Sequence, residues 1–412
     1  MLSSEIIKKI NVIKNEVDTP FWFYEEEKLL AKIELLKKFD VIRFAQKANS
    51  NIHILKIMHE NNLSVDAVSL GEIERAHLAG FRNTSESHSI VYTSDMIDSN
   101  TIERVIELNI PVNAGSPQIL EQIGKRKKKH PVWLRINPGF GHGHSQKTNT
   151  GGVNSKHGNW HEYLGECYSL IEKYELELIG LHMHIGSGVD YKHLEKVCDS
   201  MVKYAKECPF PIKAISAGGG IPIAYKADEN EIDINHYFSI WDKARKKIEK
   251  LTNRKIYLEV EPGRFLVGNS GCLVTKVRAI KKMGENNFII TDSGFNDLMR
   301  PAMYGSYHKI SAITNKQYNQ SELIPTIVGG SLCESGDIFT QDSTGIPRKI
   351  LLSTVEIDDL IVVHDCGAYG ASMSSNYNSK PLSPEVLISR VGHRLIRKRQ
   401  NFTHLLALET DL

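Results

Sequence analysis

Short apolar runs alternate with longer amphipathic stretches through the first two thirds of the chain. Between the runs, apolar residues recur at helical spacing, as in GEIERAHLAG (71–80) and HLEKVCDSMVKYAKE (193–207). Eight runs have the length and composition of buried strands, namely VIRFAQK (41–47), SVDAVS (64–69), SIVYTS (89–94), PVNAG (111–115), VWLRINP (132–138), LIGLHMH (178–184), AISAGGG (214–220) and IYLEVEPG (256–263). This repeat predicts a (β/α)8 barrel of the TIM type over residues 25–264.

The pattern changes after about residue 265, where strand-like runs follow one another without helices between them. Turn residues separate these runs, so they predict a mostly antiparallel β domain over 265–412. The early run TPFWFY (19–24) reads as a strand that has no partner in the barrel, and we expect residues 1–24 to join the β domain. The fold class is therefore α/β plus β.

Composition and charge narrow the classes of protein that fit. A length of 412 residues suits two domains, and a net charge of +2 gives no field that favours nucleic acid or an anionic membrane as partner. The six cysteines form no CxxC pair, and the opening residues lack the apolar core of a signal peptide or membrane span. We expect a cytoplasmic protein without nucleic-acid or membrane partners.

Polar residues cluster where the predicted barrel strands end, which is where barrel enzymes carry their active sites. These residues are Lys47, Asp66, Ser69, Arg135, His184, Gly218, Gly219, Gly220 and Glu261. A lysine there has two interpretations. Its stem can cover apolar surface with the ammonium in water, or its amine can condense with a carbonyl as a Schiff base.

The companions of Lys47 favour the Schiff base. Three successive glycines (218–220) let backbone N–H groups approach a phosphate, and Ser187 between glycines offers more donors. His184 suits the face of an aromatic ring, and Glu261 would be costly to bury unless a cation such as a protonated pyridine nitrogen meets it. Together these groups predict pyridoxal 5'-phosphate as cofactor. His182 and His184 could bind a metal, but no third ligand is evident and we expect none.

Nine motifs along the chain then carry a family resemblance. The sequence resembles the pyridoxal-phosphate decarboxylases of the alanine-racemase-like fold, within them the meso-diaminopimelate decarboxylase family. The motifs, in order, are FAQKAN, VSLGEIERA, GFGHGHSQKTNTGG, HMHIGSG, SAGGG, EPGRFLV, DSGFNDLMRPAMYGSYH, CESGD and GAYGASMSSNYNSKPLSPEVL. The resemblance implies a fold type III enzyme and a homodimer with shared active sites.

The resemblance also implies roles for individual residues. Lys47 matches the Schiff-base lysine, His184 the residue stacked on the cofactor ring, and Glu261 the partner of the pyridinium nitrogen. Cys333 matches the proton donor and, with Glu334, is implied to come from the partner subunit. Positions near the phosphate match Ser187, Gly218, Gly219, Gly220, Gly263, Arg264 and Tyr369, and positions that hold substrate match Arg264, Arg300, Tyr304, Glu334 and Tyr369.

Substrate choice should follow the distal end of the amino acid. Diaminopimelate carries a second amino-acid centre, whose carboxylate suits an arginine fork such as Arg300, beside Glu334 for the amine. The expected reaction is decarboxylation of meso-diaminopimelate to L-lysine and CO2, the last step of lysine biosynthesis. The alternatives are a decarboxylase of another basic amino acid or carboxylated polyamine, an amino-acid racemase, and a non-catalytic homologue that carries the cofactor.

The sequence departs from the family pattern at two positions. Ser331 stands where proline is frequent in the family, and Lys380 where arginine is usual, which could weaken a bidentate contact. The Gly-rich loop 139–158 leaves the fifth barrel strand and is expected to act as a lid over substrate. Its histidines, His142, His144 and His157, are a weaker candidate for a metal site.

Overall fold

The computed structural model describes residues 3–84, 87–141, 150–184, 186, 188, 190–314 and 323–410. The chain forms two compact units. The first, here called the barrel unit, comprises residues 32–223 and 231–266. The second, the β unit, comprises residues 1–31, 224–230 and 267–412, so the segment 224–230 leaves the barrel and belongs to the β unit.

The barrel unit contains a closed ring of parallel strands, which confirms the predicted barrel. Neighbours in the ring pair in chain order, and β10 pairs with β2 to close it. Each predicted run contains one strand, and a short additional strand, β7 (Asn159–Trp160), pairs with β6. The ring consists of β2 (Val41–Ala45), β3 (Ser64–Ala67), β4 (Ile90–Ser94), β5 (Val112–Ala114), β6 (Pro131–Asn137), β8 (Glu177–His182), β9 (Ala214–Ser216) and β10 (Tyr257–Val260).

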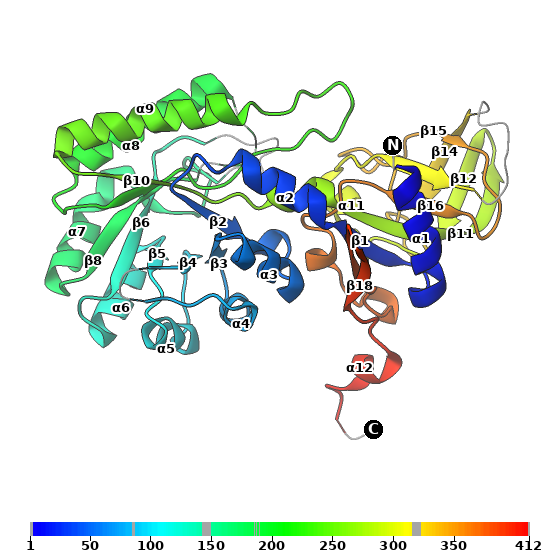
Figure 1. The fold of residues 1–412 in the computed structure, drawn as a ribbon, viewed down its shortest axis with the longest axis horizontal. Coiled ribbons are helices and arrows are strands. Elements are labelled where there is room, and N and C mark those ends of the chain that lie inside the picture. The colour runs from blue at the N-terminus through cyan, green and yellow to red at the C-terminus, as the bar shows by residue number, and fades with distance from the viewer. Residues whose placement is uncertain are drawn as a thin grey trace. The chain divides into compact units, whose positions relative to one another are not determined.

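Helices cover the outside of the ring, with α8 and α9 side by side (Figure 1). Several begin at a polar residue whose side chain accepts a backbone N–H of the first turn, such as Ser69, Asp98 and Asp233. Their apolar stripes are buried against the sheet. The helices are α3 (Ile52–Glu60), α4 (Leu70–Ala79), α5 (Ser99–Glu107), α6 (Pro117–Arg126), α7 (Leu164–Lys173), α8 (Tyr191–Glu207) and α9 (Ile234–Thr252). Helix α2 (Glu26–Leu35) begins in the β unit and ends in the barrel unit.

The β unit is a mostly antiparallel sheet, in line with the predicted fold class. Its main path runs β15-β14-β12-β11-β1-β17-β18, and β16 pairs with both β11 and β13. The run TPFWFY supplies β1, which lies between β11 and β17. The strands are β1 (Phe21–Glu25), β11 (Gly271–Met283), β12 (Asn286–Thr291), β13 (Ile310–Ile313), β14 (Leu323–Gly329), β15 (Ile350–Ser353), β16 (Leu360–Val363), β17 (Glu385–Ser389) and β18 (Gly392–Arg397).

The opening residues form α1 (Ser4–Val17), a helix for which the sequence analysis made no prediction. Ile10 and Ile13 of α1 are buried against one face of the sheet. The cluster that they join draws on five elements, through Phe21, Phe23, Cys272, Val274, Leu360, Val362, Val386 and Ile388. Helix α1 therefore covers a face of the β unit that would otherwise expose apolar side chains.

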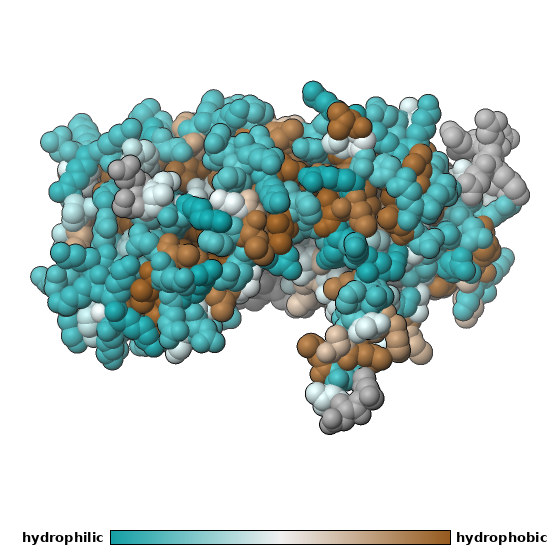
Figure 2. Space-filling model, turned by 60° about the horizontal axis from the view of Figure 1, so that its bottom comes forward, coloured by the Kyte–Doolittle hydropathy of each residue, from teal (hydrophilic) through white to brown (hydrophobic). Residues whose placement is uncertain are grey.

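Among the described residues, three short α-helices follow β10, namely α10 (Arg264–Val267), α11 (Arg300–Tyr304) and α12 (Phe402–Leu406). Figure 2 shows apolar surface on the protruding C-terminal segment, where Phe402 and Leu408 are exposed. Within the described ranges, no helix combines the length and apolar character that crossing a membrane requires.

Candidate active site

The register of the barrel strands brings polar side chains to one level at the carboxyl end of the ring. His182 at the end of β8 pairs with Arg135 of β6 on one side and with Ser216 of β9 on the other. Glu261 directly follows β10, and its N–H donates to the Gly218 carbonyl at 2.8 Å. Parallel pairing thus assembles residues from four strands that lie far apart in sequence.

Glu261 is buried and has two hydrogen-bond partners from the chain itself. Its Oε1 accepts from Ser216 Oγ and its Oε2 lies against His182 Nε2, both at 2.8 Å. Burial raises the pKa of Glu261, but the charge and hydrogen bond of His182 and the hydrogen bond from Ser216 outweigh it and lower the pKa below its usual value. Glu261 is therefore an ionised carboxylate. The sequence analysis missed both partners, which only strand register reveals.

His184 is held by the glycine turn after β9. The Gly219 N–H donates to His184 Nδ1 at 3.1 Å, so Nδ1 carries no proton and Nε2 does. Burial, with the charges of Arg135 and Lys47, lowers the pKa of His184 well below its usual value, so the ring is neutral. A Cβ on Gly220, which has φ of 89°, would lie 2.1 Å from the Gly186 carbonyl oxygen. Only glycine fits this turn.

Lys47 lies on the 3-10 turn η1 (Gln46–Ala48) that follows β2, and its side chain is exposed. Gly263 packs against this turn, because a Cβ there would lie 3.1 Å from the Ala45 carbonyl oxygen. The charge of Lys47 acts on Asp66 of β3 and on His184, which follows β8. Lys47, His184, the glycine turn and Glu261 thus all follow strands of the ring at its carboxyl end.

Asp66 of β3 is a buried carboxyl group beside this cluster. Burial and the negative charge of Glu261 raise the pKa of Asp66 to about 6, while Lys47 opposes the rise. Its Oδ1 has no hydrogen-bond partner among the residues that the structure describes. A buried oxygen of this kind can accept a proton or a hydrogen bond from a molecule that enters the site.

Glu72, in the first turn of α4, is a further member of the cluster that the sequence analysis did not select. Its Oε2 accepts from the Val68 N–H at 2.8 Å, while Ser69 Oγ accepts from the Glu72 N–H. Burial raises the pKa of Glu72 to about 7. The spacing S-x-x-E before an apolar run is a helix-start signal that could have identified this residue.

Glu72→Gln should stabilise the protein increasingly as pH rises. The folded-state pKa of Glu72 lies above its unfolded value of 4.5, so the native state loses stability as pH rises from that value to about 7. Glutamine keeps the acceptor for Val68 and removes the titration. We expect the melting temperature of the variant to exceed that of the wild type more at about pH 8 than at about pH 5.

Glu74→Gln on the same helix is the matched control. The hydrogen bond from Arg104 lowers the pKa of Glu74. The stability that the ionised Glu74 adds to the native state is therefore already nearly complete at about pH 5. The difference in melting temperature between Glu74→Gln and the wild type should therefore change little between the two pH values. If the difference in melting temperature between Glu72→Gln and the wild type were also the same at both pH values, the raised pKa of Glu72 would be contradicted.

The substrate residues named by the resemblance mostly belong to the β unit. Arg300 begins α11 and is buried, and Tyr304 ends the same helix and is half-buried. Tyr369 is half-buried with φ of 57°, a left-handed conformation that a non-glycine residue seldom adopts. Arg264 lies in the barrel unit, where it begins α10.

Cys333 and Glu334 lie on an exposed turn, which the buried Asp337 stabilises through hydrogen bonds to backbone. The Asp337 carboxylate accepts the N–H groups of Leu332 at 2.8 Å and of Phe295 at 2.7 Å. The Asp337 carboxylate therefore binds backbone, and its contribution is to shape the turn.

The two departures from the family pattern contact each other. Lys380 Nζ donates to Ser331 Oγ at 2.6 Å and to the Asp292 carbonyl oxygen at 3.2 Å. A proline at position 331 would have no hydroxyl for Lys380 and no N–H for the Ser293 carbonyl oxygen, which Ser331 reaches at 2.9 Å. Serine and lysine at these positions thus form one bridge behind the turn that carries Cys333.

Part of the predicted site lies outside the described residues. This applies to Ser187 and to residues 142–149 of the proposed lid, which include His142 and His144. His157, at the described end of the same loop, contacts the Asp95 carboxylate through Nδ1. Asp95 also accepts the Gly158 N–H at 3.0 Å.

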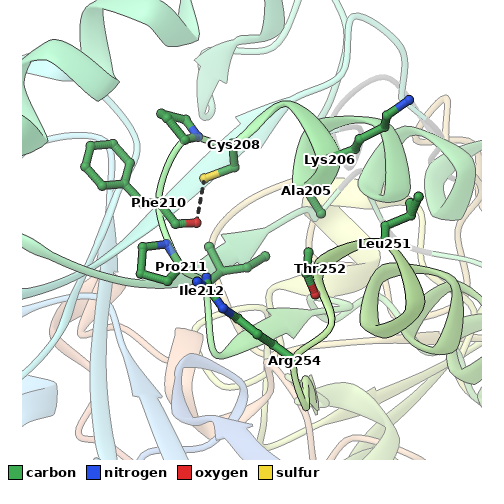
Figure 3. Close-up of a pocket in the computed structure, with 10 residues that line it drawn as sticks. Ala205, Lys206, Cys208, Phe210, Pro211, Ile212, Leu251, Thr252 and Arg254 are labelled. Atoms are coloured by element: carbon green, nitrogen blue, oxygen red, sulfur yellow. Dashed lines mark hydrogen bonds between the residues drawn. The ribbon is translucent and has the colours of Figure 1, made fainter.

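A separate pocket of about 230 Å³ lies at the other end of the barrel (Figure 3). Its residues precede β9 and β10, at the amino ends of those strands, and include Cys208, whose Sγ lies 3.7 Å from the Phe210 carbonyl oxygen. The cluster around Lys47 lies at the carboxyl ends. This pocket is therefore distinct from the candidate active site.

Comparison with known proteins identifies the family of the chain. Residues 27–268 match the family described as "Pyridoxal-dependent decarboxylase, pyridoxal binding domain". The chain is 56% identical over 404 residues to a diaminopimelate decarboxylase of Buchnera aphidicola subsp. Schizaphis graminum, covering 98% of this chain and 96% of the relative. A diaminopimelate decarboxylase of Escherichia coli K12 is 54% identical over 396 residues, covering 96% and 94%.

Solved structures give the same result. A crystal structure of a diaminopimelate decarboxylase superposes with a TM-score of 0.94 at 52% identity, covering 97% of this chain and 96% of the other. The Helicobacter pylori diaminopimelate decarboxylase complexed with L-lysine has a TM-score of 0.87 at 31% identity, covering 97% and 99%.

Lys47, His184, the glycine turn and Glu261, here called the rim, fit the cofactor that this family uses. The lysine amine suits an aldehyde, and the neutral ring of His184 suits an aromatic face. In the glycine turn, the N–H groups of Gly218 and Gly219 donate to Ser216 Oγ and His184 Nδ1, which leaves the N–H of Gly220, among the described residues, for a phosphate. The ionised Glu261 suits a protonated pyridine nitrogen. The chain belongs to the pyridoxal-dependent decarboxylase family.

Proposed function

We propose that the protein is a diaminopimelate decarboxylase, which converts meso-diaminopimelate to L-lysine and CO2 in the last step of lysine biosynthesis. The observation that carries this proposal is the ionised Glu261, held by His182 and Ser216 among Lys47, His184 and the glycine turn. Relatives that match nearly the whole chain and are named diaminopimelate decarboxylases support it.

Each residue of the rim then has a defined task. Lys47 would provide the amine for the cofactor aldehyde, His184 would cover its ring, and Glu261 would keep the ring nitrogen protonated. The resemblance assigns the phosphate to Ser187, Gly218, Gly219, Gly220, Gly263, Arg264 and Tyr369. When bound, pyridoxal phosphate accepts the electron pair that CO2 leaves behind. A carboxylate at the ring nitrogen favours this reaction over racemisation, which benefits from a poorer electron sink.

The remaining residues are assigned to substrate. Arg300, Tyr304, Glu334, Tyr369 and Arg264 bind the amino acid, with Arg300 paired to the distal carboxylate. Cys333 donates the proton that replaces CO2. We assign Cys333 and Glu334 to the active site of a partner subunit in a homodimer, and their exposure on the single chain is compatible with this.

The proposed compartment is the cytoplasm. All six cysteines are free thiols, as is usual where the surroundings are reducing.

Release of CO2 from purified protein tests the activity. With added pyridoxal phosphate, we expect L-lysine and CO2 from meso-diaminopimelate and much slower release from L-ornithine, L-arginine and L-lysine. Faster release from one of these three would identify a decarboxylase of another basic amino acid. Exchange of the α-hydrogen without release of CO2 would identify a racemase. The absence of both reactions would identify a non-catalytic homologue.

A further inference from the structure

Arg300 is buried, with 6% of its surface exposed, so its guanidinium needs acceptors within the protein. Two contacts come from one nitrogen. Nη1 donates to the Tyr225 hydroxyl and to His308 Nε2, each at 3.0 Å. Tyr225 lies in the segment 224–230 and His308 follows α11, and both belong to the β unit together with Arg300.

These contacts define the protonation state of His308. An arginine cannot accept a hydrogen bond, so Nε2 of His308 must present a lone pair to Arg300. The other ring nitrogen, Nδ1, lies 2.9 Å from the His364 carbonyl oxygen, which can only accept. Both contacts are therefore satisfied by a single form of His308, the neutral imidazole with its proton on Nδ1.

Tyr225 holds the guanidinium from another direction. The Arg300 Cζ lies 5.2 Å from the centroid of the Tyr225 ring, within the range of a cation–π contact. The same ring meets His308 edge to face, with centroids 5.5 Å apart and planes at 86°. The three side chains thus form one packed group.

We propose that Tyr225 and His308 are positioning residues that set the selectivity for a substrate with a distal carboxylate, because they hold the Arg300 guanidinium in one orientation. This inference rests on the proposed function, which assigns the distal carboxylate to Arg300. A fork donor discriminates for a carboxylate only when its plane is fixed, since an unfixed side chain loses rotamer freedom on binding. Tyr225 and His308 fix that plane before substrate arrives.

The inhibitors L-lysine and cadaverine separate this role from a general structural one. Loss of one CO2 from diaminopimelate leaves L-lysine, which keeps the distal carboxylate. Cadaverine has the same carbon chain and both amines but no carboxylate. A change confined to the carboxylate site should therefore alter inhibition by L-lysine and leave inhibition by cadaverine unchanged.

Three variants of the holoenzyme test the contacts. In His308→Leu and Tyr225→Phe, we expect KM for meso-diaminopimelate and Ki for L-lysine to rise about ten-fold each, with kcat changed less than about two-fold, the loss typical of one hydrogen bond to a charged group. In His308→Gln, whose amide oxygen can replace Nε2 as acceptor, both constants should stay within about two-fold of wild type. Unchanged constants in His308→Leu, or an equal rise for cadaverine, would overturn the inference.

His130→Leu is the matched control. His130 is a buried histidine of the barrel unit whose Nε2 lies 2.9 Å from the Ile110 carbonyl oxygen. This variant should lower the melting temperature without moving KM or either Ki. If it raises KM as much as His308→Leu does, the effect is a general consequence of destabilisation and the inference fails.

Nitrogen-15 NMR of histidine side chains gives a readout that needs neither cofactor nor turnover. We expect His308, assigned by the signal lost in His308→Gln, to carry its proton on Nδ1. Arg300→Leu should shift the Nε2 resonance, because it removes the hydrogen bond that Nε2 accepts, while the His364 carbonyl oxygen keeps the proton on Nδ1. A proton on Nε2 in the wild type would overturn the inference. If the NMR result holds but the wild type releases no CO2 from meso-diaminopimelate, the proposed function fails instead, and the assignment of the carboxylate with it.

Discussion

Lys47→Ala is expected to lower decarboxylation by about 10³-fold or more, because it removes both the amine that binds the cofactor aldehyde and a group that can transfer protons. Lys47 is suited to this role by its position. Its side chain is exposed on an otherwise buried turn at the carboxyl end of β2, and its charge acts on Asp66 and His184. Steady-state CO2 release measures the loss.

Two further measurements show whether the loss has this cause. After borohydride reduction, peptide mass mapping should find the cofactor on the peptide that contains Lys47 in the wild type and nowhere in the variant. Lys56→Ala, on the exposed side of α3, should retain both the link and the activity. A cofactor link that persists in Lys47→Ala would remove Lys47 from the proposed role.

Glu261→Gln should have the second largest effect, a fall in kcat of about 10²- to 10³-fold. Glutamine has almost the same shape and can still accept the hydrogen bond from Ser216. It lacks the negative charge that holds the ring nitrogen protonated, so the defect should lie in kcat. The charge of Glu261 also raises the pKa of Asp66, so carbon-13 NMR should show that this pKa falls in the variant.

Glu259→Gln, two residues away, is a control that separates a loss of stability from a loss of kcat. Glu259 pairs with the buried Arg43, whose Nη2 lies 3.1 Å from its Oε1. Loss of the Glu259 carboxylate leaves the Arg43 charge buried without an ion-pair partner in Glu259→Gln, which should cost about 3 kcal/mol of stability or more. The expected contrast is a large fall in melting temperature for Glu259→Gln and a large fall in kcat for Glu261→Gln. A similar kcat for Glu261→Gln and wild type would exclude the proposed role of this charge.

The barrel could be predicted because its strands are short, buried and separated by helices of clear period. The same repeat placed Lys47, His184 and Glu261 at strand ends, and the parallel ring brings those ends together. The strand order of the β unit had no such signal. There β1 lies between β11 and β17, and pairing over hundreds of residues depends on which faces are buried together rather than on local pattern.

The partners of the functional residues were harder to anticipate than the residues themselves. His182 and Ser216 reach Glu261 only because the register aligns β8, β9 and the end of β10. Tyr225 and His308 meet at Arg300 from segments 75 and 8 residues away in sequence. Such contacts leave no periodicity in the sequence, so only the three-dimensional structure reveals them.

The position of β1 has a consequence for how the protein is made. Residues 21–24 of β1 pair with residues 271–274 of β11, and residues 22–25 pair with residues 385–388 of β17. All strands of the barrel are therefore synthesised before β1 can find either neighbour. On the ribosome, the barrel can fold before β1 has a partner strand. A chain that stalls after the barrel is complete but before residue 385 would therefore expose an unpaired edge of β1, which is prone to aggregation.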